Sequence, residues 1–411
     1  CLMEPWDGPA AVAFTDGRHL GAVLDRDGLR PSRYTVTKDH RLILASETGV
    51  LDVEPSNILQ RGRLEPGRML LVDLEQKRMV GDEEIKHEMS SRRPYRRWLH
   101  EHLQHLKDLK PGGAPASLSA GDRVCRQQIF GYTREDLNIV LKPMAAGGEE
   151  PIGSMGTDTP LAVLSERPQL LFGYFKQLFA QVTNPPLDAI REALVTSMVS
   201  YIGAEGDLLN ESPVHARCFR VNNPILTNED VEKIRANPDP HFRPVTLPML
   251  FRAADGEAGL GKAMDRLCEA ASRAIAEGYR MLILSDRGAD AENAPIPSLL
   301  ATAGLAHHLI RTQARTRCGL IVESGEPREV HHFALLFGYG AGAVNPYLAL
   351  DSVRAMQAEG TVEARDGDEA ADHYIHAVIK GLLKIMSKMG ICTLRSYRGA
   401  QIFEAVGLRS G

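Results

Sequence analysis

The chain has 411 residues, of which 43% are hydrophobic and 25% are charged, a composition that is typical of a soluble globular protein with two or three domains. Its net charge of −5 and pI of about 6.3 do not support binding to nucleic acid or to an anionic membrane. No apolar run reaches the roughly 18 residues that a membrane span requires.

The cysteines are too far apart in the sequence to form a CxxC motif or an iron–sulfur spacing. They stand at positions 1, 125, 218, 268, 318 and 392. We therefore expect free thiols, and a reducing cytoplasm is the simplest location.

The first hundred residues read as antiparallel strands followed by a helix. Predicted strands cover residues 9–15, 19–25, 33–37, 41–46 and 68–73, with a tight turn at Asp16-Gly17. Residues 82–109 are amphipathic and mostly helical, with a break near Pro94. This order predicts an α+β fold with a layered sheet.

A linker is expected at residues 110–122, KPGGAPASLSAGD, which are rich in Gly, Pro, Ala and Ser and lack hydrophobic periodicity. We place the domain boundary there. The predicted domains are therefore residues 1–109 and 123–411.

The next stretch predicts two helices that present a loop. A short apolar helix ends at Gly147-Gly148, and a Gly- and Pro-rich loop covers residues 149–160. A second helix is predicted over residues 169–182, and Asn184-Pro185-Pro186 ends it. The loop is either a structural connection or a functional loop on a rigid scaffold.

Strands and helices alternate through the rest of the chain. A helix is expected at 188–202, and Thr227 with Asp230 predicts the start of another. Further strands are expected at 246–251, 280–285, 319–323 and 342–345, and further helices at 259–277, 298–315 and 328–337. Apolar strands that alternate with helices predict a parallel sheet, either a partial (β/α) barrel or an open doubly wound sheet.

Polar residues follow three of these strands, where barrel active sites are built. They are Asp286, Arg287 and Gly288, then Glu323, Ser324 and Gly325, and finally Asn345. We favour a vestigial or interface role over chemistry for them.

Other chemistry-bearing residues have simpler structural interpretations. The pairs His307-His308 and His331-His332 are adjacent on helices and cannot chelate one ion. The Gly-rich turn at 338–342 runs from helix to strand, the reverse of a phosphate-binding turn, so close backbone packing is expected. Residues 384–390 and 396–401 have two interpretations. They either belong to a capped surface helix and the residues beside it, or they face a neighbouring domain.

Several motifs resemble the large (alpha) subunit of glutamate synthases. They are GYTREDL, EPIGSMGTDTPLAVLS, YFKQLFAQVTNPPLDAIRE, LILSDRG, IPSLLATAGLAHHLIR and KGLLKIMSKMGICTLRSYRGAQIFEAVGL. EPWDGPA, DRDGLRPSRY and ASETGVL resemble the later half of a class II glutamine amidotransferase domain, whose fold has an N-terminal nucleophile. The resemblance implies a barrel-like central domain that links the amidotransferase to a flavin-binding synthase domain.

The resemblance also implies a function. This family transfers the amide nitrogen of glutamine to 2-oxoglutarate and reduces the adduct, giving two glutamates, which is a route of ammonia assimilation and glutamate biosynthesis. It implies FMN and a [3Fe-4S] cluster, both outside this fragment. Electrons come from ferredoxin or from a small (beta) subunit that carries FAD and uses NADPH or NADH; the sequence leaves the donor and the oligomeric state open.

The family's nucleophile is an N-terminal cysteine that begins a Cys-Gly sequence. Cys1 instead precedes Leu-Met-Glu-Pro-Trp, which matches the interior of the domain, so we expect the chain to be an inactive fragment and Cys1 not to act. Arg26 and Arg30 are interpreted as solvated or structural residues around a turn, with clamps for a carboxylate as the alternative. A free-standing amidohydrolase that uses Cys1 and a non-catalytic scaffold domain are the alternatives.

The family moves ammonia through an internal tunnel, which the resemblance places partly within the central domain. The tunnel candidates are Ser154, Met155 and Gly156 in the loop, and Thr183 and Asn184 at the end of the predicted second helix. Ordinary helix capping is the alternative for the last two.

Overall fold

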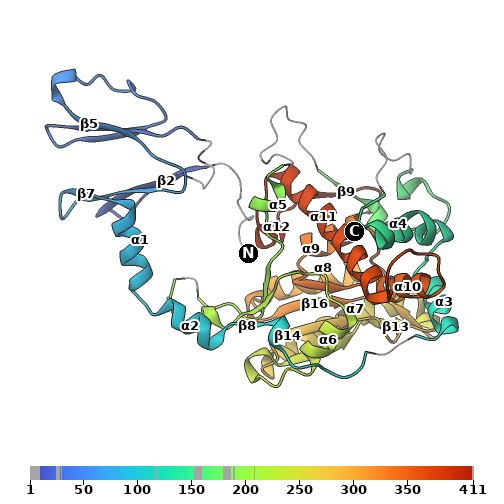
Figure 1. Ribbon diagram of the computed structural model, residues 1–411. Coiled ribbons are helices and arrows are strands. Elements are labelled where there is room, and N and C mark those ends of the chain that lie inside the picture. Colours follow the sequence, from blue (N-terminus) through green and yellow to red (C-terminus); the bar gives the residue numbers. More distant parts are fainter. Residues whose placement is uncertain are drawn as a thin grey trace. The chain divides into compact units, whose positions relative to one another are not determined.

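The computed structural model describes residues 10–24, 28, 30–115, 118–151, 160–178, 187, 190–207 and 209–409. The chain forms two compact units, Asp7–Trp98 and Leu99–Gly411, whose elements are labelled in Figure 1. No helix of the described residues is long and apolar enough to cross a membrane. The tunnel candidates, Cys1 and Arg26 lie outside the described residues.

The described residues of the first unit form two antiparallel sheets. One has the order β1–β2–β6–β7, formed by Ala11–Thr15, His19–Leu24, Met69–Asp73 and Arg78–Val80. The other has the order β4–β3–β5, formed by Leu42–Ala45, Arg33–Thr37 and Ile58–Arg63. The α+β prediction is confirmed for this unit. Strands β5 and β7 were missed because β5 is largely exposed and lacks an apolar alternation, and β7 is only three residues long.

The predicted helix at 82–109 is divided where Pro94 stands. Helix α1 spans Asp82–Ser91 and α2 spans Tyr95–His102. Beyond α2 the prediction is wrong, because Gln104–His105 form strand β8, which pairs with β11 (Phe219–Val221). In the expected linker, Gly112 packs tightly on helix α6 (Asn228–Arg235), because an added Cβ would lie 2.3 Å from the carbonyl oxygen of Glu232.

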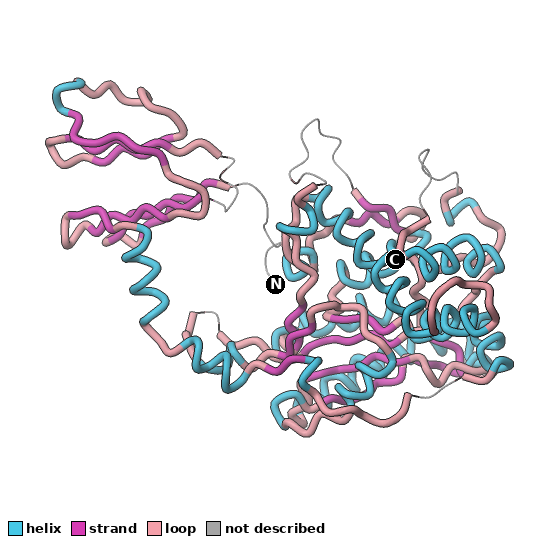
Figure 2. The backbone as a smooth tube through the Cα atoms, in the orientation of Figure 1, coloured by secondary structure: helices cyan, strands magenta, loops and turns pink. Residues whose placement is uncertain are grey.

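The second unit is built on a parallel sheet whose strand order follows the chain order. Its strands are β12 (Pro244–Pro248), β14 (Met281–Ser285), β16 (Gly319–Glu323) and β17 (Ala343–Asn345). They are connected by α7 (Gly256–Ala276), α8 (Ser298–Arg311) and α9 (Val330–Gly338), and helices cover the sheet (Figure 2). The prediction of alternating elements in a parallel sheet is confirmed. At the β17 edge, Ile225 forms a parallel bridge with Val344.

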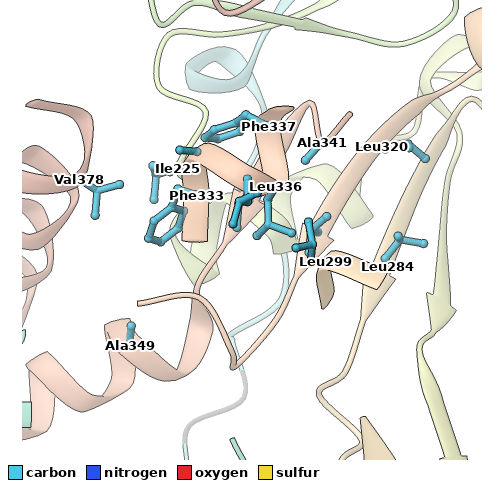
Figure 3. Packing of buried hydrophobic residues seen from close by; sticks show 14 of the residues in the cluster. Ile225, Leu284, Leu299, Leu320, Phe333, Leu336, Phe337, Ala341, Ala349 and Val378 are labelled. Carbon is cyan, nitrogen blue, oxygen red and sulfur yellow. The ribbon is translucent and has the colours of Figure 1, made fainter. Parts of the chain in front are cut away.

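Aromatic and aliphatic residues of α9 form the centre of the core. Figure 3 shows Phe333, Leu336 and Phe337 of this helix between Val378 and the sheet residue Leu320. All five are completely buried. Val378 belongs to α11 (Gly367–Met389), which packs against α10 (Tyr347–Ala358) and α4 (Lys142–Gly147).

Helix boundaries agree with local signals where these are strong. Helix α6 (Asn228–Arg235) begins at the predicted capping box of Thr227 and Asp230. Helix α4 ends at Gly147, and Gly148 adopts a left-handed conformation with a φ of 65°. Helix α8 stops at Arg311, earlier than predicted, because Gln313 has a φ of 57°, which a helix cannot contain.

Two helix predictions are wrong in the described residues. Instead of a helix from residue 169, a 3-10 turn (Leu171–Tyr174) leads into strand β9 (Phe175–Gln177), which pairs with β18 (Phe403–Ala405). Instead of a helix over 188–202, α5 covers only Glu192–Val195, and β10 (Ser200–Ile202) pairs with β11. In both places tertiary pairing overrides a helical spacing of apolar residues.

Several further elements are short or join these layers. They are α3 (Ala120–Ile129), the π-helical turn η3 (Asp136–Leu141), β13 (Leu250–Arg252), β15 (Asn293–Pro295) and α12 (Leu394–Tyr397).

Candidate functional site

The polar residues that follow β14, β16 and β17 lie at one edge of the parallel sheet, as their positions in the sequence predict. Asp286, Glu323, Ser324 and Asn345 are each completely buried. Because parallel strands end at the same edge, the sheet brings these side chains into one polar layer. The residues that surround them decide whether this layer is an open site.

Glu323 is the most strongly bound carboxylate of the layer. Its two oxygens accept hydrogen bonds from Nε of Arg287, Nη2 of Arg235 and Oγ of Ser285, each at 2.5 Å. Burial alone would raise the pKa of Glu323, but the guanidinium groups of Arg287 and Arg235 outweigh burial and hold the pKa below its usual value. Glu323 is therefore an ionised carboxylate whose charge is neutralised within the protein.

Arg287 also connects Glu323 to the start of α6. Its Nη2 donates to Oδ1 of Asn228 at 3.0 Å, and its guanidinium lies over the ring of Tyr347 at 4.3 Å. Asn228 Oδ1 accepts a second bond, from Nδ2 of Asn345 at 3.1 Å. Asn345 Nδ2 also donates to the carbonyl oxygen of Leu226, so the end of β17 is tied to the segment before α6.

Among the described residues, Asp286 has no cationic partner at hydrogen-bond distance. It accepts bonds from Ser324 Oγ at 2.5 Å and from the backbone N–H of Gly325 at 3.0 Å. Burial raises the pKa of Asp286 to about 7, and the charge of Glu326 adds to the rise, whereas the hydrogen bonds from Ser324, Gly325 and Tyr347 oppose it. Asp286 is therefore poised between its neutral and charged forms near neutral pH.

Helix α3 and the turn after it cover this layer. Nη1 of Arg126 donates to the carbonyl oxygen of Arg287 at 2.5 Å and to the hydroxyl of Tyr347 at 3.3 Å. Phe130 meets Tyr347 edge to face at 6.4 Å. An added Cβ on Gly325 would lie 2.6 Å from the Phe130 ring, so only glycine fits there. Protein side chains thus fill the space beyond these strand ends, which favours a vestigial role over chemistry for the residues there.

The buried arginine Arg328 fixes the same covering segment. Its guanidinium donates to the carbonyl oxygens of Phe130 at 3.2 Å and Gly131 at 3.0 Å, and to Asp136 at 3.1 Å. It also lies over the ring of Tyr132 at 4.3 Å. Arg328 therefore holds the residues that connect α3 to η3.

Sequence reasoning missed the residues that complete this layer, namely Arg126, Asn228, Arg235, Arg328 and Tyr347. They lie outside the strand ends. The sequence around a single arginine or tyrosine does not indicate which distant residue it contacts. The one available signal was the position of Arg126, which stands shortly before the GYTREDL motif of the resemblance.

Three of the four paired histidines have structural partners and His307 is exposed, which agrees with the expected structural or solvated roles. Nε2 of His308 lies 2.8 Å from Ser272 Oγ, and Nε2 of His331 lies 3.1 Å from the carbonyl oxygen of Phe175. His332 stacks on Phe172 at 4.3 Å. Burial lowers the pKa of His331, and lowers that of His332 strongly, so both are neutral at pH 7. Within the part of the chain that the structure describes, no group of three or more His, Cys, Asp or Glu residues could hold a metal ion.

The turn at 338–342 is packed against its surroundings, which agrees with the prediction of close backbone approach. Gly340 has a φ of 114°, and an added Cβ would lie 3.2 Å from Ala306. An added Cβ on Gly342 would lie 3.0 Å from the carbonyl oxygen of Leu320.

The first unit contains a cavity of about 140 Å³ on one face of the β4–β3–β5 sheet. Its walls include Arg33, Thr35 and Arg61 of the sheet and much of the ASETGVL motif, from Ala45 to Leu51. The ASETGVL motif therefore forms part of the wall of this cavity. Arg30 is exposed, in agreement with a structural or solvated role.

Comparison with known proteins identifies both parts of the chain. The model of the glutamate synthase central domain matches residues 125–409, and the model of class II glutamine amidotransferases matches residues 1–98. The chain is 50% identical to the glutamate synthase [NADPH] large chain of Bacillus subtilis, covering 99% of this chain and 26% of that protein.

Other glutamate synthases match over the same span. Glutamate synthase [NADH] of Schizosaccharomyces pombe is 45% identical, covering 99% of this chain and 20% of that protein. The ferredoxin-dependent enzyme of Pyropia yezoensis is 41% identical, covering 100% and 27%. The chain thus spans about a quarter or less of the length of these relatives. Since the central-domain model alone matches more than half of its residues, the chain belongs to the glutamate synthase family and represents part of its large subunit.

Proposed function

We propose that this chain is part of an enzyme that transfers the amide nitrogen of glutamine to 2-oxoglutarate and reduces the adduct, giving two glutamates. The observation that carries the proposal is 50% identity to a glutamate synthase large chain over 99% of the residues. Residues 1–109 would supply the end of the glutaminase domain, 110–122 the linker, and 123–411 the central domain.

The central domain would act as a barrel-like scaffold between the glutaminase and flavin domains. Strands in chain order and the parallel bridge of Ile225 to Val344 at the far edge support a partial barrel. The buried, internally neutralised layer around Glu323 supports a scaffold rather than a second catalytic centre.

FMN and a [3Fe-4S] cluster would be bound by parts of the longer protein outside this chain. The described cysteines, Cys125, Cys218, Cys268, Cys318 and Cys392, are free thiols and do not fit a cluster site. Ferredoxin, or a small subunit with FAD, would deliver the electrons. We expect a cytoplasmic enzyme, with the flavin domain of the same chain as the main neighbour of these residues.

We expect the longer protein that contains this chain to form glutamate from glutamine and 2-oxoglutarate when a suitable reductant is present. Three parallel assays with NADPH, NADH and reduced ferredoxin identify the donor, because relatives named for each of the three donors are 41–50% identical to this chain. Glutamate is measured by chromatography, with 2-oxoglutarate omitted as the control. Glutamine hydrolysis without amination of 2-oxoglutarate under all three donors would contradict the proposal.

We further propose that Ser154, Met155, Gly156, Thr183 and Asn184 line an ammonia path in the longer protein. The support is their small or polar character within the motifs EPIGSMGTDTPLAVLS and AQVTNPPLDAIRE. In that protein, Thr183→Trp should narrow the path while glutamine hydrolysis continues. We expect the ratio of glutamine consumed to 2-oxoglutarate aminated to rise above one, whereas Thr183→Ser keeps the wild-type ratio. A tryptophan variant with a ratio of one and normal rates would remove Thr183 from the path.

A further inference from the structure

Aliphatic side chains gather beside the two-stranded ribbon that β9 and β18 form in the central unit (β9 is labelled in Figure 1). They are Leu161, Val163 and Leu164, in or next to the 3-10 turn η4 (Ala162–Leu164), and Leu408, which follows β18. These residues are 37%, 43%, 73% and 44% exposed, in that order. We call these four residues the apolar patch.

Two segments that are far apart in the sequence meet in the apolar patch. The turn η4 packs against the next 3-10 turn, Leu171–Tyr174. The backbone N–H of Val406 donates to the carbonyl oxygen of Tyr174 at 2.7 Å. An added Cβ on Gly407 would lie 2.3 Å from Cγ2 of Val163, so the backbone after β18 lies directly against this valine. The patch is therefore one continuous surface.

Aromatic contacts fix the ribbon beside which the patch lies. The ring of Phe403 stacks on Tyr339 at 6.3 Å, and Phe175 meets the same ring edge to face at 5.6 Å. On the other face of the ribbon, Lys176 stands directly opposite Glu404, and both residues are exposed. The outward face of the ribbon is therefore charged, whereas the patch at its end is apolar.

An apolar surface of this kind indicates a contact with another part of a protein. Single exposed aliphatic residues are ordinary, but adjoining ones that present a continuous apolar area mark interaction sites. Leu164 is the most exposed residue of the patch, and burial of its side chain would be favourable because it removes apolar surface from water. A partner for the patch should therefore offer an aliphatic surface of its own.

The position of the patch indicates which partner covers it. This chain spans 26%, 20% and 27% of the three relatives described above, so most of the longer protein lies outside it. Leu408 is the residue before the last described one, so a domain that follows this chain would be tethered at the patch and held there at high effective concentration. The linker from the amidotransferase part enters the central unit elsewhere, at β8, which pairs with β11.

We propose that the apolar patch is the docking surface for the flavin domain of the longer protein. The inference rests on the proposed function, which supplies the flavin domain as the neighbour of these residues. Leu161, Val163 and Leu164 would pack against an aliphatic face of that domain, and Leu408 would fix the place where the chain passes from one domain to the other.

The test is photo-crosslinking in the longer protein, with p-benzoylphenylalanine in place of Leu164. After irradiation, cross-linked peptides are identified by mass spectrometry. We expect cross-links to peptides of the flavin domain in the same chain, at least tenfold more abundant than from a control with the probe in place of Lys262, an exposed residue of α7. Cross-links mainly to the amidotransferase part, to a small subunit or to a second copy would overturn the proposal, as would their absence.

A second measurement uses Leu164→Asp, which places a charge in the proposed contact. Because Leu164 is mostly exposed in the central unit, this unit should fold normally, and exchange in β14 should be unchanged. We expect amide hydrogen exchange over residues 161–165 to become at least tenfold faster, whereas Leu164→Met keeps the wild-type rate. Equal exchange in all three proteins would contradict docking at the patch.

The flavin spectrum of the same preparation tests the proposed function separately. A preparation that contains flavin but gives no cross-links from position 164 to the flavin domain overturns this inference alone. A preparation without flavin overturns the proposed function, and with it the partner named here.

Discussion

Glu323→Gln is expected to lower the free energy of unfolding of the central unit by about 3–5 kcal/mol. Glu323 is completely buried, and Arg287, Arg235 and Ser285 all donate to it at 2.5 Å. A neutral amide removes the negative charge but leaves the guanidinium groups of Arg287 and Arg235 in place. The loss of stability is mainly the cost of cations that have lost their counter-charge, rather than the intrinsic strength of the ion pairs.

The effect should extend beyond β16, because Arg287 also holds Asn228 and lies over Tyr347. Native-state hydrogen exchange of the longer protein, measured on peptides that cover β14, β16 and the start of α6, gives the local free energy of opening. Glu292→Gln, at an exposed position, is the control and should change it by less than about 0.5 kcal/mol. If Glu323→Gln behaves like that control, the layer contributes little to the stability of the unit.

The central sheet could be predicted from the sequence because its strands are short apolar runs separated by amphipathic helices. Met281–Ser285 and Gly319–Glu323 are buried along their whole length, which explains their continuous apolar character. Capping signals were equally reliable, as Thr227 and Gly148 show. These features depend on neighbouring residues only.

Features that depend on partners far along the chain could not be predicted. Phe175 has the spacing of a helical residue, yet it pairs with Ala405 in a two-stranded ribbon and contacts the Tyr339 ring at 5.6 Å. The candidate residues at the strand ends were located correctly, but α3 covers them through Arg126 and Phe130. Whether a polar strand end forms an open site or a filled layer depends on such distant residues.

Asp286→Asn should change stability in a manner that depends on pH. The pKa of Asp286 is raised from 3.8 to about 7 in the folded protein by burial. Between these two values the folded state binds more protons than the unfolded state, so the stability due to Asp286 falls as pH rises. Between pH 5 and pH 8 this loss is about 2–3 kcal/mol, and asparagine, which does not ionise, avoids it.

We therefore expect Asp286→Asn to be close to neutral or mildly destabilising at pH 5 and to become more favourable, relative to wild type, by about 2–3 kcal/mol at pH 8. Asparagine can keep both local bonds, because its oxygen accepts from Gly325 N–H and its amide donates to Ser324 Oγ.

Comparison with wild type at each pH removes the contributions of other buried groups, such as Glu326 and His332. Asp290→Asn controls for the loss of an exposed carboxylate. The pKa of Asp290 is lowered, so this carboxylate stays ionised between pH 5 and pH 8. The measurement is the local opening free energy of the Gly325 region at pH 5, 6.5 and 8. A difference between variant and wild type that stays constant across these values would show that Asp286 is already ionised at pH 5.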